Sequence, residues 1–278
     1  MTRDQLRVRG AFDLEQSRAF LEGWPAGNPG TDEAGLRFTY CAPPDWQPTC
    51  VRVDAALRLE ASVPVTAVLR DDVARILSVD VDGAPLDDIA AADPVVAGLV
   101  RRAPGLRPVC FWSTWEAACW AVLSQRTSMR ATSLLKQRIT EAVGPRVAFC
   151  GVKEAAFPSP PMVLDAPSLP GVNPVKFARI QGIARAAEDG ELDAGLLRSL
   201  PAGEALERLQ ALPGIGPFSA TLILIRGAGA PDVFTLNEPR VLERMQAAYG
   251  VGAGSDLAGI AEGWRPLRSW VAFLLRAA

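Results

Sequence analysis

The sequence predicts a small α+β domain over residues 1–95 and an all-helical domain over residues 96–278. In the first part of the chain, apolar and polar residues alternate with a period of two, as in half-buried strands. Beyond about residue 90, apolar residues recur at three- and four-residue spacing, as in amphipathic helices. The composition, 49% hydrophobic and 22% charged over 278 residues, is typical of a globular chain that buries a sizeable core.

Five alternating segments predict the strands of an antiparallel sheet: residues 6–9, 36–40, 51–54, 65–69 and 76–81. Asp82-Gly83 is typical of a turn, and the stretch from Asp13 to Glu22 predicts one helix. These elements make up the α+β domain.

Helical spacing in the second part is shown by Trp112, Trp115, Cys119 and Val122, and again over residues 134–139. Proline- and glycine-rich breaks divide this region into several helices; they lie at residues 144–145, 157–161, 171–174 and 201–203.

The absence of histidine excludes several kinds of chemistry. A chain without imidazole has no Ser-His-Asp triad, no Cys-His pair and no zinc site with nitrogen ligands. No two cysteines form a C-x-x-C pair, which argues against a thiolate metal site. We expect reduced, mostly buried cysteines at positions 41, 50, 110, 119 and 150.

No apolar run approaches the roughly 20 residues that a membrane span requires. The first ten residues also lack the apolar stretch of a signal peptide. We therefore expect a cytoplasmic protein with no membrane partner.

Charge is unevenly distributed along the chain. The net charge is −2, but residues 1–100 carry 9 basic and 16 acidic groups, while the remainder carries 20 basic and 15 acidic groups. Residues 101–150 hold eight basic side chains against Glu116 and Glu141. Such a local excess can attract a polyanion, or it can be a solvated arginine-rich helix face.

The most informative stretch is residues 204–227. An amphipathic helix over 204–212 ends at Pro213, and two glycines, Gly214 and Gly216, flank one aliphatic residue. Pro217 then suits the first position of a second helix, where its missing N–H costs nothing. Because glycines permit close approach of another backbone and a helix start presents N–H groups, this turn can receive a phosphate.

Residues 214–219, Gly-Ile-Gly-Pro-Phe-Ser, partly match the dinucleotide-binding fingerprint. That motif requires a preceding strand, whereas residues 204–211 have helical periodicity. We therefore disfavour a nucleotide site here, while a purely structural helical turn remains an alternative.

The Leu-Pro-Gly-Ile-Gly turn, the helix after it and the strip Asp232-Val-Phe234 resemble the helix-hairpin-helix DNA glycosylases, most closely the DNA-3-methyladenine glycosylase II branch. Residues 121–128 resemble the glutamine loop of that branch and residues 264–270 its last helix, so the resemblance covers most of the chain. It implies a monomeric enzyme that binds double-stranded DNA containing damaged bases, associates with the nucleoid, and extrudes a nucleotide before breaking its N-glycosidic bond.

In this family an aspartate four residues after the phenylalanine of the strip stabilises the oxocarbenium-like sugar, and Glu238 holds that position here. The additional methylene moves the carboxylate by about 1 Å, and a misplacement of that size can cost about a hundredfold in rate. Pro239 fixes the start of the following helix. The alternative role for Glu238 is that of a first-turn acid favoured by the helix dipole.

The resemblance also implies residues that contact the base and the DNA. The base pocket would be formed by Phe218, Leu222 and Trp112. The residues expected to contact DNA are Gln125, Arg126, Gly214, Gly216 and Ser219.

No cofactor is required under this interpretation. Phe218 replaces the lysine that bifunctional relatives use, so we expect no lyase step, and no cysteine follows Cys150 to hold an iron–sulfur cluster. Relatives hold a monovalent cation on carbonyl oxygens of the hairpin, which here would belong to Gln210, Leu212 and Ile215.

The leading hypothesis is a monofunctional DNA N-glycosylase of base excision repair that acts on alkylated (3-methyladenine-type) or otherwise labile purines, with Glu238 as its catalytic carboxylate. A second hypothesis is a catalytically weakened relative that binds damaged or distorted DNA. A third is a helical protein-interaction domain.

Overall fold

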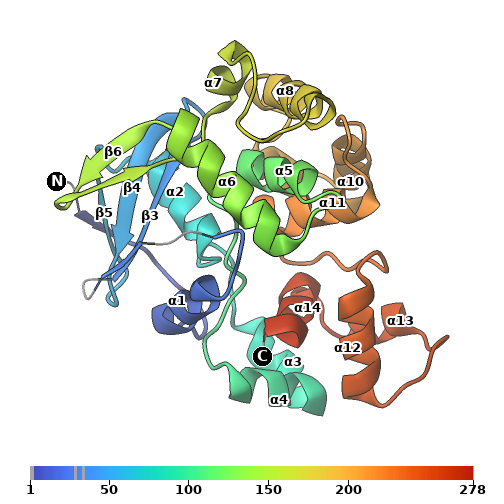
Figure 1. Ribbon diagram of the computed structural model, residues 1–278. Coiled ribbons are helices and arrows are strands. Elements are labelled where there is room, and N and C mark those ends of the chain that lie inside the picture. The colour runs from blue at the N-terminus through green and yellow to red at the C-terminus, as the bar shows by residue number, and fades with distance from the viewer. Residues whose placement is uncertain (1–2, 28–29, 33–34, 278) are drawn as a thin grey trace.

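The computed structural model describes residues 3–27, 30–32 and 35–277 (Figure 1). An antiparallel sheet occupies the N-terminal part, with the strand order β1-β5-β4-β3-β2. In its central pair Leu36 lies opposite Val53 and Phe38 opposite Val51, all fully buried. The strands are β1 (Arg3–Gln5), β2 (Gly30–Asp32), β3 (Gly35–Ala42), β4 (Gln47–Val53) and β5 (Arg58–Ala61).

Two helices complete this unit, α1 (Leu14–Glu22) and α2 (Ala67–Ile76). The first agrees with the predicted helix. The second shows that the strand predicted at residues 65–69 is wrong, because residues 67–69 form the first turn of this helix. The strand predicted at residues 76–81 is wrong as well, because the helix ends at Ile76 and turns follow it. Leu69, Val73 and Ile76 are buried at helical spacing, and Thr66 caps the helix by accepting a hydrogen bond from the Leu69 amide at 3.1 Å.

The sheet differs from the prediction at its edges. Strands at 36–40 and 51–54 are confirmed with shifted bounds. The strand predicted at residues 6–9 is wrong, because the first strand is residues 3–5, which pair with β5 (Arg58–Ala61). The pattern missed β5 because Asp54 accepts backbone hydrogen bonds from Ala56 and Arg58 in a tight turn, which leaves only four residues for the strand.

The second part is helical, as predicted, with one exception. A hairpin of β6 (Arg146–Phe149) and β7 (Val152–Ala155) packs beside β3 and β4, where Glu154 receives hydrogen bonds from Arg37 and Thr39. The helices before the 204–227 segment are α3 (Pro85–Ala92), α4 (Pro94–Arg102), α5 (Thr114–Leu123), α6 (Met129–Val143), α7 (Pro160–Asp165), α8 (Pro174–Glu188) and α9 (Ala194–Ser199).

Three hydrophobic clusters support these elements. One lies between the sheet, α1 and α2, and a second surrounds the fully buried helix α5. The third joins α3 and α4 to the last helices, α12 (Pro239–Tyr249), α13 (Leu257–Glu262) and α14 (Arg268–Ala277). Figure 1 shows this third group on the opposite side of the molecule from the β6–β7 hairpin. The domain boundary between residues 95 and 96 stays a prediction.

The five cysteines are present as free thiols, four of them buried. Within the described part of the chain, every helix is too short or too polar to cross a membrane.

Candidate active site

Residues 202–227 form the predicted hairpin. Helix α10 (Ala202–Gln210) leads through a turn into α11 (Pro217–Leu222), which continues as one π-helical turn, η1 (Ile223–Gly227). Pro217 occupies the first turn of α11, as its chemistry predicts. Ile215 is buried between the two helices.

The two glycines of the turn differ in their surroundings. Gly214 has a φ of +78°, and a Cβ atom there would lie 2.5 Å from Cδ of Arg179. Gly216 has a φ of −96°, and a Cβ atom there would meet nothing within 4 Å. Gly214 is therefore required by the fold of the hairpin, whereas Gly216 leaves an open backbone surface for a ligand.

The glutamine loop contacts the hairpin directly. Nε2 of Gln125 donates a hydrogen bond to the carbonyl of Gly214 at 2.7 Å, and Nη1 of Arg179 donates to Oε1 of Gln125 at 2.7 Å. The neighbouring residue, Arg126, is exposed and has a φ of 53°. A left-handed conformation in a non-glycine residue is frequent at functional positions. Ser219 is half-buried in the first turn of α11.

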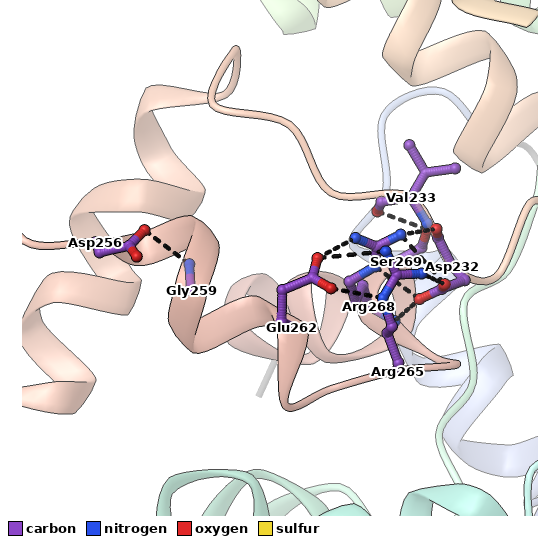
Figure 2. A network of polar contacts seen from close by, with 8 residues as sticks. All are labelled: Asp232, Val233, Asp256, Gly259, Glu262, Arg265, Arg268 and Ser269. Atoms are coloured by element: carbon purple, nitrogen blue, oxygen red, sulfur yellow. Dashed lines mark hydrogen bonds and ion pairs between the residues drawn. The ribbon is translucent and has the colours of Figure 1, made fainter. Parts of the chain in front are cut away.

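A clamp of charged side chains fixes the strip before α12 against the start of α14 (Figure 2). Arg268 donates from Nε to Oδ1 of Asp232 at 2.8 Å, and Arg265 donates to Oδ2 at 2.7 Å. Oγ of Ser269 accepts from the Val233 amide and donates to the Val233 carbonyl, both at 2.9 Å. Because this strip leads directly to residue 238, the clamp sets where α12 begins relative to α14.

Glu238 is the N-cap residue of α12, but its side chain makes no capping hydrogen bond. Instead, Oε1 accepts a hydrogen bond from Nη1 of Arg276 in the last turn of α14. The side chains are 26% and 45% exposed respectively, so solvent reaches both partners. The carboxylate still lies at the N-terminus of α12, so the role of a helix-start acid favoured by the dipole stays open beside the catalytic one.

A pocket of about 70 Å³ lies between the hairpin and the last helices. It contains Phe218 and Leu222, which the sequence assigned to a base pocket, together with Glu238. Larger depressions of about 700 and 770 Å³ lie on the N-terminal domain, away from every motif residue. Besides Phe218, Leu222 and Glu238, the smaller pocket is lined by Thr221, Ile225, Arg226, Asn237, Val241, Ser269, Ala272, Phe273 and Arg276.

Arg226 reaches this pocket from the π-helical turn and was not identified from sequence. Its Nε donates a hydrogen bond to the Val109 carbonyl at 2.9 Å. The guanidinium carbon lies 4.4 Å from the ring centroid of Trp24, 5.3 Å from that of Phe20 and 5.1 Å from that of Phe273. Burial lowers the pKa of Arg226 to about 10, which leaves it charged at neutral pH.

Trp112 lies elsewhere, which corrects its assignment to the pocket of Glu238. Its ring stacks on Phe38 with centroids 4.5 Å apart and planes 13° from parallel. It is buried, and the depression that it lines also includes Lys136 and Glu154. Packing between the sheet and α5 explains this position. Trp115 and Trp270 are buried as well.

Comparison with known proteins identifies sequence relatives of the chain and solved structures of the same fold. No protein-family model matches the chain. The DNA-3-methyladenine glycosylase of Bacillus subtilis is 26% identical over 228 residues, covering 78% of this chain and 75% of that protein. A probable bifunctional transcriptional activator/DNA repair enzyme AlkA of Mycobacterium tuberculosis is 32% identical over 205 residues, covering 70% of this chain but only 40% of that protein.

A solved structure, the 3-methyladenine DNA-glycosylase of Archaeoglobus fulgidus, shares the fold with a TM-score of 0.79 and 21% identity, covering 99% of this chain and 97% of that one. The architecture is therefore that of the helix-hairpin-helix DNA glycosylases. In sequence, the chain is also similar to the DNA-3-methyladenine glycosylase 2 of Escherichia coli, with 28% identity over 194 residues, covering 66% of each protein.

Proposed function

We propose that the protein is a monofunctional DNA N-glycosylase that hydrolyses the N-glycosidic bond of alkylated or otherwise labile purines. The observation that carries this proposal is the position of Glu238. Its carboxylate lines a pocket with Phe218 and Leu222 of α11, the helix that follows the open backbone at Gly216. The names of the sequence relatives support the same chemistry.

The reaction uses one water molecule. As the bond between C1′ and the base nitrogen breaks, its electron pair leaves with the base and positive charge develops on the sugar. The carboxylate of Glu238 stabilises that charge and orients the water whose oxygen attacks C1′. The products are an abasic site and the free base, and the proton lost by water passes to the carboxylate or to solvent.

The hairpin and the neighbouring glutamine loop would contact the DNA. Gly216 would approach a phosphate through its open backbone, with Ser219 beside it and Gly214 shaping the turn. Because Gln125 is held by the hairpin and Arg179, we assign the residue that fills the gap left by the extruded base to the exposed Arg126.

A monovalent cation would bind to carbonyl oxygens of Gln210, Leu212 and Ile215. The Leu212 carbonyl accepts the Ile215 amide at 3.1 Å, which leaves one lone pair for a cation. Such an ion would stiffen the turn that meets the phosphate. With Phe218 rather than lysine in α11, the proposal includes no covalent bond to the sugar.

One observation favours a second candidate, a protein that binds damaged DNA without cutting it. The ion pair with Arg276 offsets the charge that Glu238 would offer to the sugar. Duplexes with single defined lesions distinguish the two candidates. Formation of abasic sites on at least one duplex supports the glycosylase, and salt-dependent binding without base release on every duplex supports the binding protein.

A further inference from the structure

Positive charge dominates the pocket beside Glu238. Among the described residues that line it, Glu238 is the one carboxylate, whereas Arg226 and Arg276 both contribute guanidinium groups. The neighbouring clamp of Asp232, Glu262, Arg265 and Arg268 lies outside this lining. A base entering the pocket therefore meets two guanidinium groups and one carboxylate, with Arg276 paired to Glu238 and Arg226 bonded to the Val109 carbonyl.

The aromatic surface of the pocket is largely committed to the protein itself. Of the two phenylalanines in the lining, Phe273 already faces the guanidinium of Arg226 at 5.1 Å from its ring centroid. Phe218 is 50% exposed and remains to stack on a base, while residues 222 and 272 are aliphatic. A cationic base would find little cation–π stabilisation here and would be repelled by both arginines.

An uncharged base has the opposite requirement. When its bond to C1′ breaks, the electron pair leaves with the base, which becomes an anion until solvent protonates it. A guanidinium close to the departing base stabilises that negative charge and donates hydrogen bonds to carbonyl oxygens or ring nitrogens. An arginine keeps its own proton throughout, because its pKa lies far above neutral pH.

Glu238 and Arg276 are placed for this division of charge. The carboxylate comes from the start of α12 and the guanidinium from the end of α14, and the two are paired in the structure. The Arg276 side chain is 45% exposed, so it can swing away from its partner when a base enters. The carboxylate would then face the sugar, where positive charge develops, and the guanidinium would face the base.

We infer that Arg276 makes this pocket selective for uncharged damaged bases that present hydrogen-bond acceptors, in preference to cationic alkylated purines. The inference rests on the proposed glycosylase function and narrows its substrates from alkylated or otherwise labile purines in general to uncharged damaged bases. It assigns to Arg276 the role of stabilising negative charge on the departing base, in addition to its ion pair with Glu238.

The test compares two matched duplexes, one with a single hypoxanthine, which is uncharged, and one with a single 7-methylguanine, which is cationic. Single-turnover excision is measured for the wild type, Arg276→Gln and, as a control for lost surface charge, Arg7→Gln, an exposed arginine of the N-terminal domain. We expect the wild type to excise hypoxanthine faster. Arg276→Gln should lose about tenfold or more on hypoxanthine and none on 7-methylguanine, because Glu238 is then unpaired.

Two results would overturn the inference while leaving the glycosylase function intact: faster excision of 7-methylguanine by the wild type, or equal losses on both duplexes in Arg276→Gln. Equal losses would mean that Arg276 only supports the fold or binds DNA. No excision of either base by the wild type would instead overturn both this inference and the proposed function. Arg7→Gln should match the wild type on both duplexes.

Discussion

Arg276 donates a hydrogen bond to the carboxylate of Glu238, linking the end of α14 to the start of α12 across the pocket. This contact joins the residue proposed to stabilise the sugar to the residue that we infer contacts the base. Because the same carboxylate can pair with Arg276 or with a sugar, the charge that the pocket presents depends on the position of the Arg276 side chain.

The two hairpin glycines should respond differently to substitution. Gly216→Glu adds a side chain into open space and places negative charge where a phosphate would lie. We expect duplex affinity to fall about tenfold with little change in the free energy of unfolding. Gly214→Ala should instead destabilise the protein by about 1–2 kcal/mol, because it forces a Cβ atom against Arg179 at positive φ. Duplex titration and urea unfolding measure both; similar behaviour of the two variants would argue against this distinction.

Arg126 offers a test of base extrusion. Arg126→Gly keeps the left-handed backbone, which glycine adopts without strain, and removes only the side chain. We expect single-turnover excision to slow by about tenfold from loss of the stacking side chain, with stability unchanged or slightly raised. Excision at the wild-type rate would show that another residue fills the gap.

The clamp at Asp232 should be important for stability. In Asp232→Asn, Arg265 and Arg268 lose a charged partner that is only 25% exposed, so we expect a loss of about 1–3 kcal/mol in the free energy of unfolding. Glu204→Gln, which removes an exposed pair with Arg208 on α10, serves as the control and should cost less than about 0.5 kcal/mol. Equal costs in urea unfolding would mean that the clamp does not hold the strip.

Alkaline pH should weaken the fold through its buried thiols. Burial raises the pKa of Cys41 to about 12 and that of Cys50 to about 11. Above the ordinary thiol pKa of about 9, the unfolded chain releases these protons while the folded chain retains them, so the free energy of unfolding falls as pH rises. Urea unfolding at about pH 7.5 and about pH 10 should show the fall, and replacing both cysteines with alanine should reduce it. A fall of the same size in that variant would assign it to other groups.

The sequence predicted the elements that depend on local chemistry. Pro217 starts α11, and the pair of glycines marks the turn, because both effects are set by backbone geometry within a few residues. The strands predicted at residues 65–69 and 76–81 were wrong because each was read in a short window, while the helical spacing of Leu69, Val73 and Ile76 spans both. The β6–β7 hairpin was missed because its partners, Arg37 and Thr39, lie over a hundred residues away.

The residues of the candidate site likewise fall into those that the sequence predicted and those that depend on tertiary packing. Glu238, Phe218 and Leu222 share one pocket, as the family resemblance implied, while Trp112 packs against Phe38. Nothing in the pattern pointed to Arg226, because the π-helical turn shifts the register of the residues that follow α11. The pairing of Glu238 with Arg276 likewise depends on how α12 and α14 pack.

The most direct test of the central claim is the single-turnover rate of base release by Glu238→Gln, measured together with its duplex affinity on the best substrate of the wild type. The account predicts a rate at least about a hundredfold lower, because the amide no longer offsets charge on the sugar, and a Kd within about twofold of the wild-type value. Release at the wild-type rate with unchanged affinity would show that Glu238 is not the catalytic carboxylate.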